Sequence, residues 1–254
     1  MSLKALNLRR YLPPKPTIAE NWYENPVQTI PVEVQGEYSQ TADGACRVIF
    51  GEESHVGFVK PRPDNSNPNV VANEKLASDL AHLLHLPVAP VVIRATEDNW
   101  PNFTALSLVC FEQGRHWARG VSNPNDKLLE ALESLRIFWS WIGDVDHNGH
   151  PENLLYELDG ELYKLAAIDH SYSFGHGDSD PLTSPASTGY NTQNIESVNT
   201  ARTLALEAIE QLEWTEVEHI FDRLVGKVLT ESDAIDRLKW LEIRRNGLRQ
   251  ISGI

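Results

Sequence analysis

The sequence has very little sulfur and no long apolar run, and these absences exclude several classes of protein. Its 254 residues include only one methionine and two cysteines, Cys46 and Cys110. Two widely separated cysteines form neither the disulfide framework of a small secreted domain nor a cysteine-based metal site. We expect both to be ordinary thiols in a reducing cytosol. No apolar run approaches the roughly 18 residues of a transmembrane helix, so we expect a cytoplasmic protein without a membrane span.

Basic residues are also scarce relative to acidic ones. The 22 lysines and arginines face 36 aspartates and glutamates, which gives a formal net charge of −14. A field of this sign repels the phosphate backbone of nucleic acids and the surface of anionic lipids, so we expect neither as a partner. A nucleotide such as ATP can still bind where local cations and a metal ion cancel the repulsion.

The length and the hydrophobic pattern predict an arm followed by two lobes. A chain of 254 residues suits one large domain or two closely apposed lobes. The first 16 residues carry four basic side chains and no acid, and they lack the apolar core of a signal peptide. An extended arm is therefore expected over 1–29, followed by an N-terminal lobe over 30–113 and a C-terminal lobe over 114–254.

The N-terminal lobe is expected to be an antiparallel sheet with one helix. Leucines recur at helical spacing after the loop 61–69, which predicts a helix of about 16 residues that ends before Pro87. A hairpin turn is predicted at Asp43–Gly44, and residues 112–125 are interpreted as a linker. Strands are predicted by alternation and turn signals over 30–38, 45–50, 55–60, 91–95 and 104–111.

The C-terminal lobe is expected to be mostly helical, with one small strand pair. Thr215 and Glu218 predict a capping box at the start of its third helix. The stretch 175–197 has no periodicity and is interpreted as a loop. Helices are predicted over 127–142, 199–212, 215–227 and 231–248, and strands over 153–156 and 162–168.

The polar loop after the helix 127–142 suggests two kinds of metal site. Residues 144–149 match the opening of an EF-hand calcium loop, but its twelfth position, normally a bidentate glutamate, is Leu155. This mismatch excludes an EF-hand. A metal hydrolase is a second interpretation, although the spacing matches no compact ligand motif. Its candidate ligands are Asp144, Asp146, His147, His150, Asp169, His170 and His176.

Five polar residues occur in an order that is typical of ATP-dependent phosphoryl transfer. They are a strand lysine, a helix glutamate, a loop aspartate and asparagine, and an aspartate after a strand: Lys60, Glu74, Asp146, Asn153 and Asp169. Alone, the lysine could be a snorkelling edge residue and the glutamate an ordinary solvated side chain. The aspartate after an apolar strand needs a cation or metal, because an unpaired buried carboxylate costs several kcal/mol.

Two segments that contain these residues resemble the HipA-like kinases, which are relatives of the phosphoinositide lipid kinases. GFVKPRPDNSNPNVVANEKLASDLAHLLHLPVAPVVI (57–93) resembles their lysine strand and N-E helix. FWSWIGDVDHNGHPENLLY…LYKLAAIDHSYSFGHG (138–177) resembles their catalytic core, with its D-R-H-x-x-N loop and I-D-H-G-x-S/A-F metal motif. The resemblance implies a two-lobed, α+β, protein-kinase-like fold over roughly residues 30–180.

The same resemblance implies roles for the five residues. Lys60 would contact the phosphates of ATP, Glu74 would hold the lysine, Asp146 would act on the acceptor hydroxyl, and Asn153 and Asp169 would bind Mg²⁺. The loop departs from the family pattern, because seven steps separate Asp146 from Asn153 where the family has five. Asp144 therefore stays open as the alternative base. Ser171 replaces the family's glycine.

The function expected from the resemblance is ATP- and Mg²⁺-dependent phosphorylation of a serine or threonine hydroxyl on a protein. A kinase for a metabolite or an antibiotic is the alternative enzyme. A nucleotide-binding pseudokinase or regulator is the alternative without catalysis, and the altered loop and Ser171 favour it. No residue of the sequence specifies the acceptor, an antitoxin-like partner or the oligomeric state.

Overall fold

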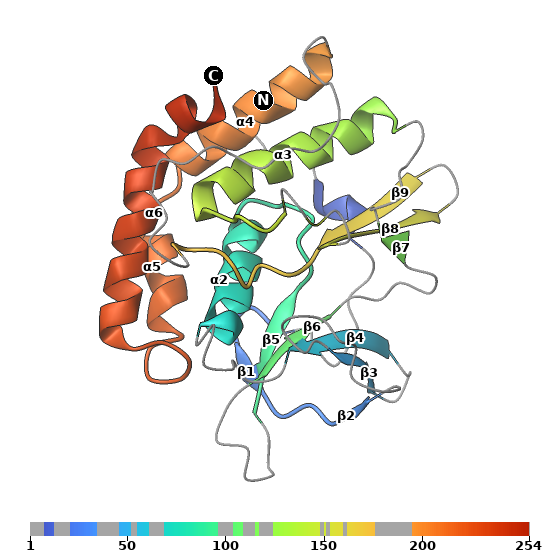
Figure 1. Ribbon diagram of the computed structural model, residues 1–254, viewed down its shortest axis with the longest axis vertical. Helices are drawn as coiled ribbons and strands as arrows, with labels where there is room; N and C mark the ends of the chain where they lie inside the picture. Colours follow the sequence, from blue (N-terminus) through green and yellow to red (C-terminus); the bar gives the residue numbers. More distant parts are fainter. Residues whose placement is uncertain are drawn as a thin grey trace.

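The computed structural model has two lobes, with a curled sheet in one and most of the helices in the other (Figure 1). The predicted turn at Asp43–Gly44, the loop 61–68 and Cys110 lie outside the residues that the structure describes. The described residues are 8–12, 21–34, 46–51, 55–60, 69–95, 104–108, 115–116, 124–147, 150, 153–159, 162–175 and 195–253.

The N-terminal lobe is built on a six-stranded sheet with the strand order β1-β5-β6-β4-β3-β2. The β1–β5 pair is parallel and the other pairs are antiparallel. Because β4 lies between β3 and β6, its last residue, Lys60, is inside the sheet and pairs with Ala105. The strands are β1 (Val27–Gln28), β2 (Val32–Val34), β3 (Cys46–Phe50), β4 (His55–Lys60), β5 (Val91–Arg94) and β6 (Thr104–Ser107).

Helix α2 (Val70–Leu83) lies between the sheet and the helices of the C-terminal lobe (Figure 1). It contacts β5 and β6 on one side and α5 on another. Twelve of its 14 residues are buried, including several polar ones. Leu76 and Leu80, on its predicted apolar stripe, are fully buried, and the helix ends before Pro87 as expected.

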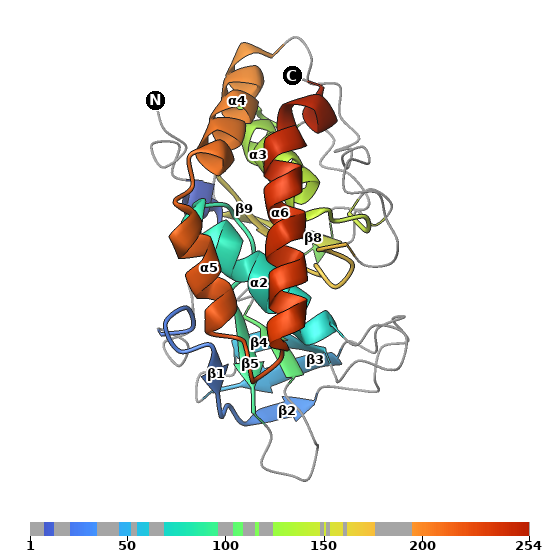
Figure 2. The same ribbon diagram turned by 90° about the vertical axis from the view of Figure 1, so that its left-hand side faces the viewer.

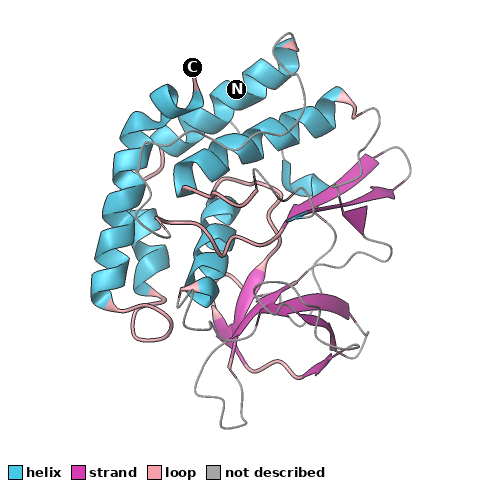
Figure 3. Ribbon diagram, in the orientation of Figure 1, coloured by secondary structure: helices cyan, strands magenta, loops and turns pink. Residues whose placement is uncertain are grey.

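The described part of the C-terminal lobe combines four helices with a three-stranded sheet. Helix α3 (Asp126–Ile142) packs on α4 (Glu196–Glu210) and α6 (Glu231–Ser252), and α5 (Trp214–Asp222) lies beside α6 (Figure 2). The sheet has the order β7-β8-β9, formed by β7 (Arg115–His116), β8 (Leu154–Asp159) and β9 (Leu162–Ala167). Figure 3 shows the helices gathered on one side of the molecule and the two sheets on the other.

Most predicted elements are confirmed, but the helix predicted over 215–227 ends at Asp222, and three further features differ. The predicted arm contains a short 3-10 helix, η1 (Leu8–Tyr11), and also β1, which adds to the sheet. The predicted linker contains β7, which pairs with β8. The capping box predicted at Thr215 is wrong: α5 begins after Glu213, and the capping box is at α6, between Thr230 and Asp233. The lobe boundaries themselves stay a prediction.

The core of the described part joins α2 to the C-terminal lobe. Its largest hydrophobic cluster combines residues of α2, α3, α4, α5 and α6, whereas a smaller one lies within the N-terminal sheet around Phe50 and Trp22. Helix α2 therefore joins the two lobes, because the same cluster also contains Val91, Ile93 and Ala105 of the N-terminal sheet. Among the helices that the structure describes, none is long and apolar enough to cross a membrane.

Candidate active site

Lys60 and Glu74 form a buried ion pair between the sheet and helix α2. The lysine Nζ lies 2.9 Å from Glu74 Oε1. Only 7% of Lys60 and 3% of Glu74 is exposed to solvent. Both simpler interpretations are therefore wrong, because Lys60 is not a snorkelling edge residue and Glu74 is not solvated. A charged pair inside a protein needs further polar contacts to offset its lost hydration.

Asp169, from the segment that follows β9, completes this cluster. Its Oδ1 accepts a very short hydrogen bond from Lys60 Nζ, and the Ser171 hydroxyl donates to the same oxygen at 2.5 Å. Ser171 Oγ also lies 2.9 Å from Lys60 Nζ. Burial alone would lower the pKa of Lys60, but the charges of Glu74 and Asp169 raise it above its ordinary value. Lys60 is therefore a cation shared by two carboxylates.

Helix α2 also holds the backbone that carries Asp169. The His170 N–H donates to Glu74 Oε1 at 3.0 Å, and Asn73 Nδ2 donates to the carbonyl oxygens of Ser171 and Ser173 at 2.7 and 3.1 Å. These bonds stabilise a strained backbone, since Asp169 has a φ of 65°. The sequence places Asn73 in the N-E helix of the family pattern but assigns it no role, because its partners lie about 100 residues later in the chain.

Asp146 and Asn153 form a second pair in the loop between α3 and β8. Asn153 Nδ2 donates to Asp146 Oδ2 at 2.7 Å, and His150 Nε2 lies 3.4 Å from Asp146 Oδ1. The Ile168 N–H donates to the Asn153 carbonyl at 2.9 Å, which ties this loop to the start of the Asp169 segment. Burial, and then the negative charge of Asp169, raise the pKa of Asp146. The five predicted residues thus lie in two adjacent groups.

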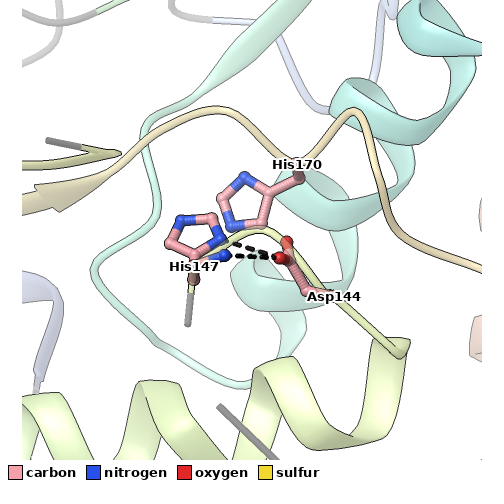
Figure 4. A group of neighbouring side chains, drawn as sticks. All are labelled: Asp144, His147 and His170. Carbon is pink, nitrogen blue, oxygen red and sulfur yellow. Dashed lines mark hydrogen bonds and ion pairs between the residues drawn. The ribbon is translucent and has the colours of Figure 1, made fainter. Parts of the chain in front are cut away.

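A third group, Asp144, His147 and His170, is buried between the loop after α3 and the Asp169 segment (Figure 4). His147 Nδ1 is 2.9 Å from Asp144 Oδ1, and the Ser173 hydroxyl donates to Asp144 Oδ2 at 3.0 Å. Burial alone would raise the pKa of Asp144, but His147 and then His170 bring it down to about 2. Burial and the neighbouring His147 lower the pKa of His170 to about 3.

The third group offers ligand atoms within 4.8 Å of one another, but their present contacts favour a supporting role. Trp139 Nε1 donates to His170 Nε2 at 3.4 Å, and the Trp139 ring stacks on His147 at 4.3 Å between centroids. Burial lowers the pKa of His147, but the charge of Asp144 raises it overall, so the two side chains already satisfy each other as an ion pair. We interpret the group as a buried support for the Asp146 loop.

The donor atoms around Asp146 and Asp169 fit Mg²⁺, which prefers carboxylate and amide oxygens. Because Asn153 Nδ2 is engaged by Asp146, the amide oxygen of Asn153 is its remaining ligand atom. Lys60 and Ser171 both contact Oδ1 of Asp169, which leaves its second oxygen, Oδ2, for a cation. A cation here would also relieve the repulsion between Asp169 and Asp146.

Comparisons with known proteins identify the fold. No protein-family profile matches the chain, and neither does any curated protein. The fold is similar to that of CtkA, a Helicobacter pylori proinflammatory kinase, with a TM-score of 0.61 and 11% sequence identity over 89% of this chain and 96% of that one. The chain therefore has a two-lobed protein-kinase-like fold, as predicted; at this identity the likeness shows the fold alone.

Two further solved structures match more weakly. Hydra Fam20 with sugar has a TM-score of 0.48 at 12% identity and covers 98% of this chain and 96% of its own. The Golgi casein kinase has a TM-score of 0.47 at 9% identity and covers 92% of this chain and 75% of its own. These lower scores carry no further argument.

Proposed function

We propose that the chain is an ATP- and Mg²⁺-dependent phosphotransferase of the HipA-like kinase type that acts on a serine or threonine hydroxyl of a protein. The observation that carries the proposal is the contact of buried Lys60 with both Glu74 and Asp169. Protein-kinase chemistry needs a strand lysine paired with a helix glutamate, beside an aspartate that binds metal. These three side chains come from β4, α2 and the segment after β9, in the order that this chemistry requires.

Each residue of the cluster has a role in the proposed reaction. Lys60, held as a cation, binds the α- and β-phosphates, and Glu74 fixes the direction of the lysine side chain. Asp169 Oδ2 and the Asn153 amide oxygen hold the metal. Mg²⁺, when bound, neutralises phosphate charge and stabilises the charge that develops during transfer. The metal is needed because a triphosphate approaches a site that already contains several carboxylates.

Asp146 is the residue that we assign to the acceptor hydroxyl. About a fifth of its side chain (19%) is exposed, and its raised pKa suits a group that must accept a proton. Asp144 is a poor alternative, since its carboxylate is buried, contacts His147 and Ser173, and has a pKa of about 2. Two extra residues in the loop, relative to the HipA-like pattern, are compatible with Asp146 as base.

The acceptor class and the HipA-like type rest on the resemblance of 57–93 and 138–177 to that family. CtkA, a solved structure with a similar fold, is named a kinase, which agrees with a phosphotransferase. The direct test incubates the purified chain with γ-labelled ATP and Mg²⁺, with and without lysate proteins, beside an Asp169→Asn control.

Each outcome of this labelling experiment identifies one function. Labelled protein that depends on Asp169 supports the proposal. Labelled metabolite without labelled protein indicates the small-molecule kinase. Tight nucleotide binding without any transfer indicates the pseudokinase, for which the serine at position 171 is the feature to examine. A chain that neither binds nor turns over ATP contradicts all three.

A further inference from the structure

Helix α2 carries a second buried ion cluster, which does not touch the candidate active site. Lys75, the residue after Glu74, is fully buried. Its Nζ donates to Asp79 Oδ1 at 2.7 Å and to the Trp22 carbonyl at 2.9 Å, and it lies 4.6 Å from the centroid of the Trp22 ring. A lysine buried in this way is fixed by three contacts, one with Asp79 and two with Trp22.

Arg223, which directly follows α5, closes the cluster from the C-terminal lobe. Its Nη2 donates to Asp79 Oδ2 at 3.4 Å and its Nη1 donates to the Tyr23 carbonyl, while the guanidinium lies 4.4 Å over the Tyr23 ring. The Tyr23 ring stacks on His82 of α2 at 4.3 Å between centroids. We call Trp22, Tyr23, Lys75, Asp79 and Arg223 the α2 clasp.

Burial opposes the ionised forms of the lysine and the aspartate in the α2 clasp. Burial raises the pKa of Asp79 to about 6 although two cations contact it, and burial lowers the pKa of Lys75. Lost hydration therefore outweighs the attraction at both groups, and the exposed Glu24 adds a small negative field. Replacing such a cluster with apolar side chains is often neutral or stabilising. The contacts of the clasp join α2 to the segment 21–25 and to Arg223 after α5, so they affect the position of α2.

The same helix presents Asn73 and Glu74 to the Asp169 segment and Lys75 and Asp79 to the clasp. In protein kinases, the position of the corresponding helix controls whether the lysine–glutamate pair forms. We propose that Lys75, Asp79 and Arg223 are positioning residues that fix α2 against α5 and the segment 21–25, so that Glu74 meets Lys60 without a separate activating event. The catalytic consequence rests on the proposed function, whereas the fixing of α2 does not.

The test replaces all three charges together with Lys75→Met/Asp79→Leu/Arg223→Met, which leaves no unpaired buried charge. Hydrogen exchange is measured for α2, with α3 of the same molecule as internal control. We expect a melting temperature close to that of the parent, exchange of α2 amides at least about tenfold faster, and unchanged exchange in α3. Arg223→Met, which removes the contact from α5 but leaves the buried Lys75–Asp79 pair intact, is measured in parallel in case the triple variant does not fold.

Calorimetry of Mg²⁺–ATP binding supplies the functional readout. We expect the triple variant to bind about 2- to 30-fold more weakly than the parent, the range of couplings carried through a packed element. Arg249→Met, which removes an exposed pair with Glu210 far from α2, is the matched control and should bind like the parent.

The hydrogen-exchange and calorimetric measurements distinguish a failure of the clasp inference from a failure of the proposed function. If the parent does not bind Mg²⁺–ATP, the proposed function fails, and hydrogen exchange alone decides the role of the clasp. Unchanged α2 exchange in a folded clasp variant overturns the inference. In a parent that binds nucleotide, unchanged affinity in that variant overturns it as well, because the clasp would then be ordinary packing.

Discussion

Helix α2 carries two buried ion clusters that have opposite composition. We call the cluster at Glu74 the negative cluster. It has one cation, Lys60, and two carboxylates, Glu74 and Asp169, so its formal charge is −1. The cluster at Asp79 has two cations, Lys75 and Arg223, and one carboxylate, so its formal charge is +1. The cluster at Glu74 is partly exposed to solvent at Asp169, whose side chain is 23% exposed, whereas the Asp79 carboxylate is fully buried.

The net charge of the two clusters has different partners. In the α2 clasp, two backbone carbonyl oxygens and two aromatic rings contact the cations, so the protein itself provides partners for the extra positive charge. At Asp169 the extra negative charge stays partly exposed beside a second carboxylate, Asp146. A site that is incomplete in this sense suits a divalent cation, and through it a triphosphate.

The largest expected effect follows from Asp146→Asn, which removes the proposed base beside the negative cluster. Turnover should fall by about 10²- to 10⁴-fold, because a positioned acid–base group acts mainly in the transition state. Mg²⁺–ATP affinity should stay close to that of the parent. Initial rates and calorimetry on the same preparation check both points, and full turnover in this variant would show that Asp146 is not the base.

Lys60→Ala breaks the negative cluster itself by removing its only cation. Turnover should fall by about 10²- to 10³-fold, the usual cost of losing a preorganised charge aimed at the reacting group. The two carboxylates left behind repel each other, so some loss of stability is also expected. Lys239→Ala is the control, since Lys239 is an exposed lysine of α6. Equal rates in the two variants would contradict the role of Lys60.

Lowering the pH should destabilise the fold by protonating Asp144, which belongs to the buried group that supports the Asp146 loop. Its folded-state pKa of about 2 is below the unfolded value of about 4, so ionised Asp144 stabilises the fold above pH 4, and this stability is lost as the pH falls toward 2. Linkage gives a loss of about 1 kcal/mol by pH 3. Urea unfolding at pH 7 and pH 3 measures the free energy of unfolding. The parent should show this loss between the two pH values, and Asp144→Asn should not. Equal sensitivity would mean that Asp144 has no depressed pKa.

The smallest effect is expected from Ser171→Ala, which sharpens the assignment of the negative cluster. The change removes one hydroxyl that contacts both Lys60 and Asp169. Mg²⁺–ATP affinity should fall by about 2- to 10-fold, the equivalent of one hydrogen bond. Calorimetry measures the change. An increase in turnover instead would identify Ser171 as the feature that restrains activity.

The sequence predicts the active-site elements better than their surroundings. Strand β4 was predictable from its alternation and confirmed over His55–Lys60, and the helix with Glu74 was predictable from its leucine spacing. Both signals are local, because a side chain that faces the core recurs with the period of its own element. The burial of Glu74 was not predictable, since it depends on the Asp169 segment some 95 residues later.

The α2 clasp has no sequence signal for the same reason. Tyr23 and Arg223 are separated by 200 positions, and nothing local marks either as a partner of Asp79. The two-residue strands β1 and β7 are too short to show a period of two, so the sequence could not distinguish them from the arm and the linker. Ser171 was visible as a departure from a family pattern, but its two hydrogen bonds required the fold.

The most direct test of the account is the Mg²⁺ dependence of ATP binding in Asp169→Asn. The parent should bind ATP more tightly with Mg²⁺ than without it, and Asp169→Asn should lose that increase while staying folded. Asp222→Asn, an exposed aspartate at the end of α5, should behave like the parent. An Asp169→Asn variant that binds Mg²⁺–ATP as the parent does would contradict the assignment of the negative cluster as the metal and nucleotide site.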